Sequence, residues 1–200
     1  MFTIHHEAPF DVDRREALLD AVMGEARFTK TAARLRENRL SADGLSFVAR
    51  AQRHIIGTVQ LWNISAGPGC PALLLGPLAV ASDCRNRGVG TALVRHALSE
   101  AQRRGYGIVL LVGDAPYYGR FGFSNEKTQG LWLPGPYERD RLLAHELAAG
   151  ALDGARGLVH ATGRFAPKPD LSALVAGLFA GRAAVSDLHR KENSIASRAA

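Results

Sequence analysis

The sequence predicts an α/β fold in which a mixed central β-sheet is flanked by helices. Two apolar runs support this prediction: 72–80, and 108–112, which reads Ile-Val-Leu-Leu-Val. Apolar runs of this length are typical of strands buried on both faces. Between them, over 89–104, apolar residues such as Leu93 and Ala97 are spaced i, i+4 and predict a helix. Strand, turn, helix and strand in this order form a βαβ-like core unit.

The part of the chain before this unit alternates short strand and helix patterns. Asp11 or Asp13 could cap the first helix, and the Gly- and Pro-rich stretch 65–71 is expected to be a loop. In chain order, the expected elements are a strand over 2–6, a helix over 14–23, an arginine-rich helical piece over 31–38 and a hairpin of strands 45–51 and 55–62.

The part after the unit is irregular and ends in a change of character. A short turn or helix over 116–120 and a Gly- and Pro-rich loop precede late strands at 142–147 and 158–160. Beyond Phe165, Pro167 and Pro169 interrupt the chain. We therefore expect one domain over 1–165 and a C-terminal extension over 166–200, with a helix at 171–179 and a frayed end.

The composition excludes several classes of protein. The 200 residues include 21 arginines and only four lysines, and the net charge is +6. No apolar run approaches the roughly 20 residues that cross a membrane, and no basic stripe interleaved with aromatics points to nucleic acid. Cys70 and Cys84 form neither a zinc motif nor a disulfide framework, so no metal is expected. A cytoplasmic protein without membrane or nucleic-acid partners is the expectation.

The segment 78–91 carries the strongest chemical signal. A buried strand ends here, a polar turn with Arg85 and Arg87 follows, and a helix begins at Gly88 and Gly90. The first amides of a helix lack partners and bind anions, and glycines let a diphosphate approach the backbone. The pattern matches neither a P-loop nor a dinucleotide-binding fingerprint. It is a phosphate-binding turn, or a turn that only packs helix against sheet.

Two motifs resemble those of the GNAT superfamily of acetyl-CoA-dependent N-acetyltransferases. Arg85-Asn86-Arg87-Gly88-Val89-Gly90 fits its [Gln/Arg]-x-x-Gly-x-[Gly/Ala] signature. Tyr118, four residues before Gly122-Phe123, fits its second landmark. The resemblance covers 2–160 and is nearest to a bacterial branch of acetyltransferases. It implies a mixed sheet of about six to seven strands whose central parallel strands splay apart after a β-bulge.

The resemblance also implies roles for individual residues. Tyr118 matches the general acid that protonates the departing CoA thiolate, and Tyr117 is the neighbour that could be mistaken for it. The residues that would contact acetyl-CoA, through backbone groups of the strand and of the turn, are Leu78, Ala79, Val80, Arg85, Asn86, Arg87, Gly88, Val89, Gly90 and Thr91.

The general base is harder to place, because neither buried strand contains the acidic residue that many relatives have. Asp114 follows the second buried strand and is either the base or a turn residue beside Gly113; water could also relay the proton. Candidate acceptor-site residues are Glu25, Arg27 and Phe28. Trp62 and Trp132 are either acceptor-pocket or packing residues.

The resemblance implies acetyl transfer to a primary amine by direct attack in a ternary complex, with acetyl-CoA as cosubstrate. The acceptor, a small molecule or a protein amine, is not identified by the sequence, and a homodimer is compatible with the family. The alternative is a catalytically weak acyl-CoA-binding regulatory module of the same fold. A nucleotide or nucleic-acid binder that uses the arginines is a third interpretation.

Overall fold

A mixed eight-stranded sheet organises the domain in the computed structural model, which describes residues 1–167. Six strands follow the order β1-β2-β3-β4-β5-β7, while β8 pairs with β3 and with β6. Only β4/β5 and β6/β8 are parallel pairs. The strands are β1 (Thr3–His6), β2 (Ser46–Ala51), β3 (His54–Ala66), β4 (Pro71–Val80), β5 (Ile108–Val112), β6 (Leu131–Trp132), β7 (Leu142–Glu146) and β8 (Gly157–Ala161).

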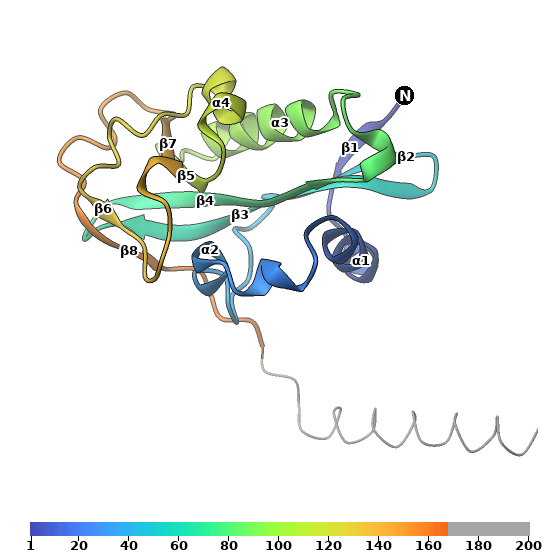
Figure 1. Ribbon diagram of the computed structural model, residues 1–200, viewed down its shortest axis with the longest axis horizontal. Coiled ribbons are helices and arrows are strands. Elements are labelled where there is room, and N and C mark those ends of the chain that lie inside the picture. Colours follow the sequence, from blue (N-terminus) through green and yellow to red (C-terminus); the bar gives the residue numbers. More distant parts are fainter. Residues whose placement is uncertain (168–200) are drawn as a thin grey trace, which may run out of the picture. The chain divides into compact units, whose positions relative to one another are not determined.

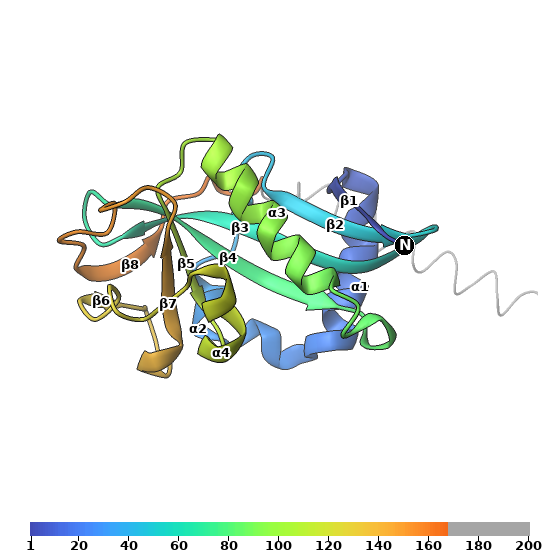
Figure 2. The ribbon, with the colours of Figure 1, turned by 90° about the horizontal axis from the view of Figure 1, so that it is seen from above.

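Helices cover both faces of this sheet (Figures 1 and 2). Figure 1 shows α3 and α4 on one face and α1 and α2 on the other. Short 3₁₀ turns lie at 9–11, 25–28, 82–84, 119–121 and 139–141. The helices are α1 (Val12–Met23), α2 (Thr31–Arg34), α3 (Val89–Arg103) and α4 (Ala115–Tyr118). Among residues 1–167, no helix has both the length and the apolarity to cross a bilayer.

The predicted α/β architecture is therefore confirmed, with some differences in its parts. The sheet has eight strands rather than six or seven, because β6 and β8 add a short parallel pair. The second helix ends at Arg34 instead of continuing to 38, and β3 runs on to Ala66 inside the stretch expected to be a loop. The predicted boundary near 165 stays a prediction, and the helix expected at 171–179 lies outside the described residues.

The βαβ unit is held together by close packing of α3 on the sheet. Leu93, Val94 and Ala97 of α3 are completely buried against β2, β3 and β4. A Cβ at Gly57 of β3 would lie 2.9 Å from Leu93 Cδ1 and from Val89 Cγ1. The absence of a side chain at Gly57 thus lets the first turn of α3 rest on the sheet, next to the end of β4.

Asp11 does not cap α1, contrary to one of the two expectations. Its carboxylate is completely buried and accepts hydrogen bonds from the Ala8 backbone N–H, at 2.9 Å, and from the Arg50 guanidinium on β2. Burial alone would raise the pKa of this carboxyl, but these two hydrogen bonds lower it below its usual value of 3.8. Asp11 therefore anchors the start of α1 to the sheet.

Replacing Asp11 by Asn is expected to lower the free energy of unfolding at pH 7 by about 2–3 kcal/mol, because the buried ion pair is lost. The folded-state pKa is depressed, so this stabilisation is complete above pH 3.8 and disappears as the pH falls through the lower folded-state value. Urea unfolding at pH 7 and in acid measures both effects. Asp13→Asn, at an exposed position in the same turn, is the control; an equal loss in both variants would contradict the anchor.

Candidate active site

The two central parallel strands separate after only two paired residues. β4 and β5 are in register at Leu73 with Val109 and at Leu74 with Leu110. β4 continues for six more residues beyond Leu74, up to Val80. The register between β3 and β4 shifts within this stretch, since Val59 is opposite Leu78 but Leu61 is opposite Leu75. One extra residue on β4 therefore forms a bulge at Gly76 and Pro77, opposite Gln60.

Beyond the bulge, some backbone N–H and C=O groups of β4 are not hydrogen-bonded to a neighbouring strand. The Ala81 N–H donates to the Ile56 carbonyl at 2.9 Å, so Ala81 and Ala79 form the hydrogen-bonded pairs with β3. Because such pairs alternate along antiparallel strands, Leu78 and Val80 direct their N–H and C=O groups away from β3. That side is the gap toward β5, whose pairing with β4 has already ended. The gap thus offers free donors and acceptors to an extended ligand.

A cleft of about 510 Å³ lies at the open end of the gap. Gly88, in the left-handed conformation (φ 77°), precedes the 15-residue helix α3, whose first amides face the cleft. A Cβ at Gly90 would lie 2.8 Å from the Tyr117 hydroxyl, so a side chain there would reduce the open space. The cleft is lined by Val80, Cys84, Arg85, Asn86, Gly88, Val89, Gly90, Thr91, Tyr117 and Arg120.

The electrostatics of this cleft favour an anion. Within residues 1–167, neither Arg85 nor Arg120 has a carboxylate within ion-pair distance. The Arg120 guanidinium stacks on the Tyr117 ring at 4.2 Å. The positive end of α3 points in the same direction. Two free cations and a helix N-terminus are a combination that suits a diphosphate.

The side chains of Tyr117 and Tyr118 extend from α4 into different environments. Tyr117 lies in the cleft. Tyr118 is half-buried, and its ring lies so close to Gly113, which directly follows β5, that it leaves no room for a Cβ on Gly113. Burial, together with the neighbouring Tyr117, raises the pKa of the Tyr118 hydroxyl to about 12. Tyr118 thus stays protonated at neutral pH, beside the strand end that borders the gap.

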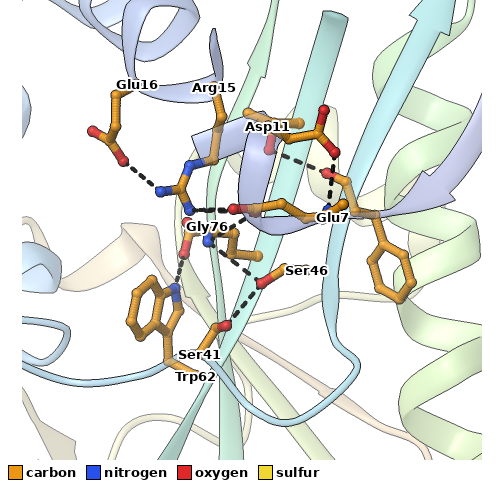
Figure 3. Close-up of polar contacts among 12 residues, drawn as sticks. Glu7, Asp11, Arg15, Glu16, Ser41, Ser46, Trp62 and Gly76 are labelled. Carbon is orange, nitrogen blue, oxygen red and sulfur yellow. Dashed lines mark hydrogen bonds and ion pairs between the residues drawn. The ribbon is translucent and has the colours of Figure 1, made fainter. Parts of the chain in front are cut away.

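A second cavity, of about 390 Å³, lies on the face covered by α1 and α2; we call it the arginine pocket. It reaches the bulge at Pro77, and Trp62 Nε1 donates to the Gly76 carbonyl at 2.6 Å (Figure 3). Arg15 lies between the carboxylates of Glu16 and the buried Glu7, at 2.8 and 3.1 Å. The pocket is lined by Arg15, Glu16, Leu19, Arg27, Phe28, Ala33, Arg34, Arg36, Glu37, Gln60, Trp62 and Pro77.

Comparison with known proteins identifies the family. A model of the acetyltransferase (GNAT) domain matches residues 42–125, which include the bulge, the cleft turn and both tyrosines. The uncharacterized N-acetyltransferase YhbS of Escherichia coli (strain K12) is 30% identical over 157 residues, which are 78% of this chain and 93% of that relative. The chain belongs to the GNAT family of N-acetyltransferases.

Solved GNAT structures agree with this assignment. The crystal structure of Escherichia coli YhbS in complex with CoA has a TM-score of 0.69 at 29% identity, covering 80% of this chain and 89% of that one. A GNAT acetyltransferase of Brucella melitensis, in complex with acetyl-CoA, has a TM-score of 0.52 at 23% identity over 85% and 94% of the two chains. The second likeness concerns the fold alone.

The lining of the cleft has the chemistry that a diphosphate such as that of CoA needs. Of the ten residues predicted to contact acetyl-CoA, the cleft brings together Val80, Arg85, Asn86, Gly88, Val89, Gly90 and Thr91. Leu78 is at the gap through its backbone, whereas the Ala79 backbone is paired with β3 and the Arg87 side chain is exposed. Arg120 also lines the cleft but was not among the predicted residues. Its position two residues after Tyr118 could have indicated that it lies near the site.

The other predicted site residues do not all lie at a cavity. Arg27, Phe28 and Trp62 line the arginine pocket. Glu25 is exposed and lies outside the pocket lining, and Trp132 is exposed on β6. Asp114 is exposed at the start of α4, where its carbonyl accepts the backbone N–H of Tyr117 and Tyr118. Within residues 1–167, no three His, Cys, Asp or Glu side chains gather as they would around a metal ion.

Proposed function

We propose that this GNAT protein transfers the acetyl group of acetyl-CoA to a primary amine by direct attack within a ternary complex. One observation carries the proposal: the gap that exposes the backbone of Leu78 and Val80 is continuous with a phosphate-type cleft at one end, and its bulge borders a pocket on the opposite face. A thioester in the gap would meet an amine arriving from the pocket, which is the arrangement that direct transfer needs.

The cleft and the gap would position the donor. The amides at the start of α3, with Arg85 and Arg120, would bind the diphosphate of acetyl-CoA, which supplies the thioester. Backbone N–H groups of Leu78 and Val80 would donate to the pantetheine and to the thioester carbonyl. A donor aimed at that oxygen stabilises the negative charge that develops on it during attack.

Tyr118 would act as the general acid. The amine nitrogen forms a bond to the carbonyl carbon, the C–S bond breaks, and the Tyr118 hydroxyl gives its proton to the thiolate, regaining one from water. A pKa of about 12 keeps this proton available. The burial that raises it would also raise the pKa of the thiolate that leaves into the same site.

The amine must also lose a proton, and Asp114 or a water molecule would accept it. Asp114 lies close enough to Tyr118 to affect its pKa. Its exposure makes a water-mediated path as suitable as direct contact. The strands β4 and β5 contain no acidic residue, which supports the alternative function, an acyl-CoA-binding regulatory module with weak catalysis.

Release of free thiol from acetyl-CoA in the presence of a panel of amines separates the two functions. An acetyltransferase is expected to release thiol in proportion to acetylated amine, detected by mass spectrometry. A regulatory module would bind CoA, measured by calorimetry, without amine-dependent release. Binding without turnover across small amines, peptides and protein amines would overturn the proposed transfer.

A further inference from the structure

The arginine pocket contains two arginines that form no ion pair with a carboxylate of the described residues. Four arginines and two glutamates line it. The Glu16 carboxylate is already shared by Arg15 and Arg27, at 2.8 and 2.5 Å. Arg15 also pairs with Glu7, and Arg27 with Asp20. Two of the four guanidinium groups are thereby compensated, which leaves Arg34 and Arg36.

Arg36 is the more buried of these two arginines. Its Nε donates to the Ala32 carbonyl at 3.2 Å, and no carboxylate of residues 1–167 lies within ion-pair distance of it. Burial and the nearby Arg27 lower its pKa to about 10, so it is still charged at neutral pH. Its two terminal nitrogens remain for a ligand. Arg34, by contrast, is exposed and donates to the Pro134 carbonyl at 3.3 Å.

Trp62 connects Arg36 to the reaction site. The Arg36 guanidinium carbon lies 6.0 Å from the centre of the Trp62 ring system. The same indole is fixed by its hydrogen bond to the Gly76 carbonyl, at the bulge (Figure 3). The width of one indole ring therefore separates the free cation from the gap. An acceptor that spans this distance is a small molecule, and the cavity volume of about 390 Å³ is in the range of small-molecule sites.

We propose that the acceptor is a small amino carboxylate, such as an amino acid, whose carboxylate is held by Arg36 while its amine faces the gap beside Pro77. This inference rests on the proposed acetyl transfer and specifies its substrate class. A guanidinium presents paired N–H donors that match a carboxylate. Trp62 would pack against the carbon skeleton between the two groups.

The pocket lining of the described chain offers few partners for a second ammonium group. Among its carboxylates only Glu37 has no ion pair, whereas Glu16 is already shared by Arg15 and Arg27. Polyamines and aminoglycosides, which have several ammonium groups, would therefore fit this pocket less well than an amino carboxylate.

The test compares each of the common amino acids with its own carboxamide as acceptor, using thiol release from acetyl-CoA. The amide keeps the side chain and loses the carboxylate charge, but its amine is also less basic. The kcat/KM values are therefore expressed per neutral amine, and the change in their ratio between the wild type and Arg36→Gln isolates the carboxylate. For at least one amino acid, this ratio is expected to be about 10- to 100-fold in favour of the acid, from charge-assisted hydrogen bonds. Arg36→Gln should reduce the ratio to near one, mainly by raising KM for the acid.

Arg53→Gln, which removes an exposed arginine outside the pocket, is the control and should keep the wild-type ratio. Thermal unfolding with CoA bound shows whether each variant is folded. Equal rates for acids and amides in the wild type would overturn the carboxylate assignment while leaving acetyl transfer intact. So would selective turnover of polyamines or of protein amines. CoA binding without turnover of any amine would instead refute the proposed function itself.

Discussion

Tyr118→Phe is expected to lower kcat by about 100-fold or more, with little change in the affinity for CoA. The removed hydroxyl is the proposed proton donor for the thiolate, and general acids contribute on the order of 10²–10⁴ to rate. The ring itself is retained, so its packing 5.9 Å from Phe123 and its contact with Gly113 persist. Steady-state kinetics between pH 7 and 9 measure the loss, and calorimetry with CoA measures the affinity.

Tyr117→Phe is the matched variant, because it removes the same atom from the adjacent residue. It should change kcat far less, since the Tyr117 hydroxyl lies over Gly90 at the start of α3 rather than beside β5. A loss confined to Tyr117→Phe would move the acid to that residue. Two variants with wild-type kcat would mean that water protonates the thiolate.

Gly88→Glu is expected to raise the dissociation constant for CoA on the order of 100-fold. The new carboxylate would stand at the first amides of α3, where the diphosphate is expected, and like charges placed together cost several kcal/mol. The fold should tolerate the change in charge, because an acidic side chain is favourable at a helix N-terminus. Nothing within 4 Å obstructs a Cβ at this position.

Gly88→Ala separates the charge from the backbone effect. Both variants place a side chain on a residue with φ 77°, which carries a similar conformational cost. The alanine variant should therefore bind CoA within about tenfold of the wild type, because the strain at this residue is present in the free and in the CoA-bound protein alike. Isothermal titration calorimetry of both proteins gives the comparison. Similar affinities for the two variants would place the diphosphate elsewhere.

The elements predicted most accurately are those whose signals are local. The strand over 108–112 and the helix that begins at Val89 are as expected, because an apolar run and an i, i+4 pattern are each contained in one segment. The cleft turn was equally visible, since its glycines and arginines are adjacent in sequence. These features were enough to predict the fold and to propose the segment of the chain at which an anion would bind.

The features that the sequence did not reveal depend on contacts between distant segments. Asp11 has the residue type and the position of a helix cap. Its carboxylate instead binds Arg50, which lies 39 residues later in the sequence. The arginine pocket combines α1, α2, β3 and β4, so no short pattern could indicate that Arg36 stands near Trp62 without a carboxylate. Pocket chemistry of this kind follows from tertiary packing and not from propensity.

The bulge in β4 shifts the alternation of side chains along the strand by one residue. Leu73 and Leu75 face α3 before it, and Leu78 and Val80 face α3 after it, although strict alternation would have assigned that side to 77 and 79. One extra residue thus keeps the hydrophobic core continuous, and on both sides of the bulge the residues that face α3 are those whose peptide groups point away from β3. The peptide groups of Leu78 and Val80 are available for chemistry because β4, bent at the bulge, is no longer paired with β5. A protein engineer who deletes one residue between Leu75 and Leu78 should recover an ordinary strand and lose the site.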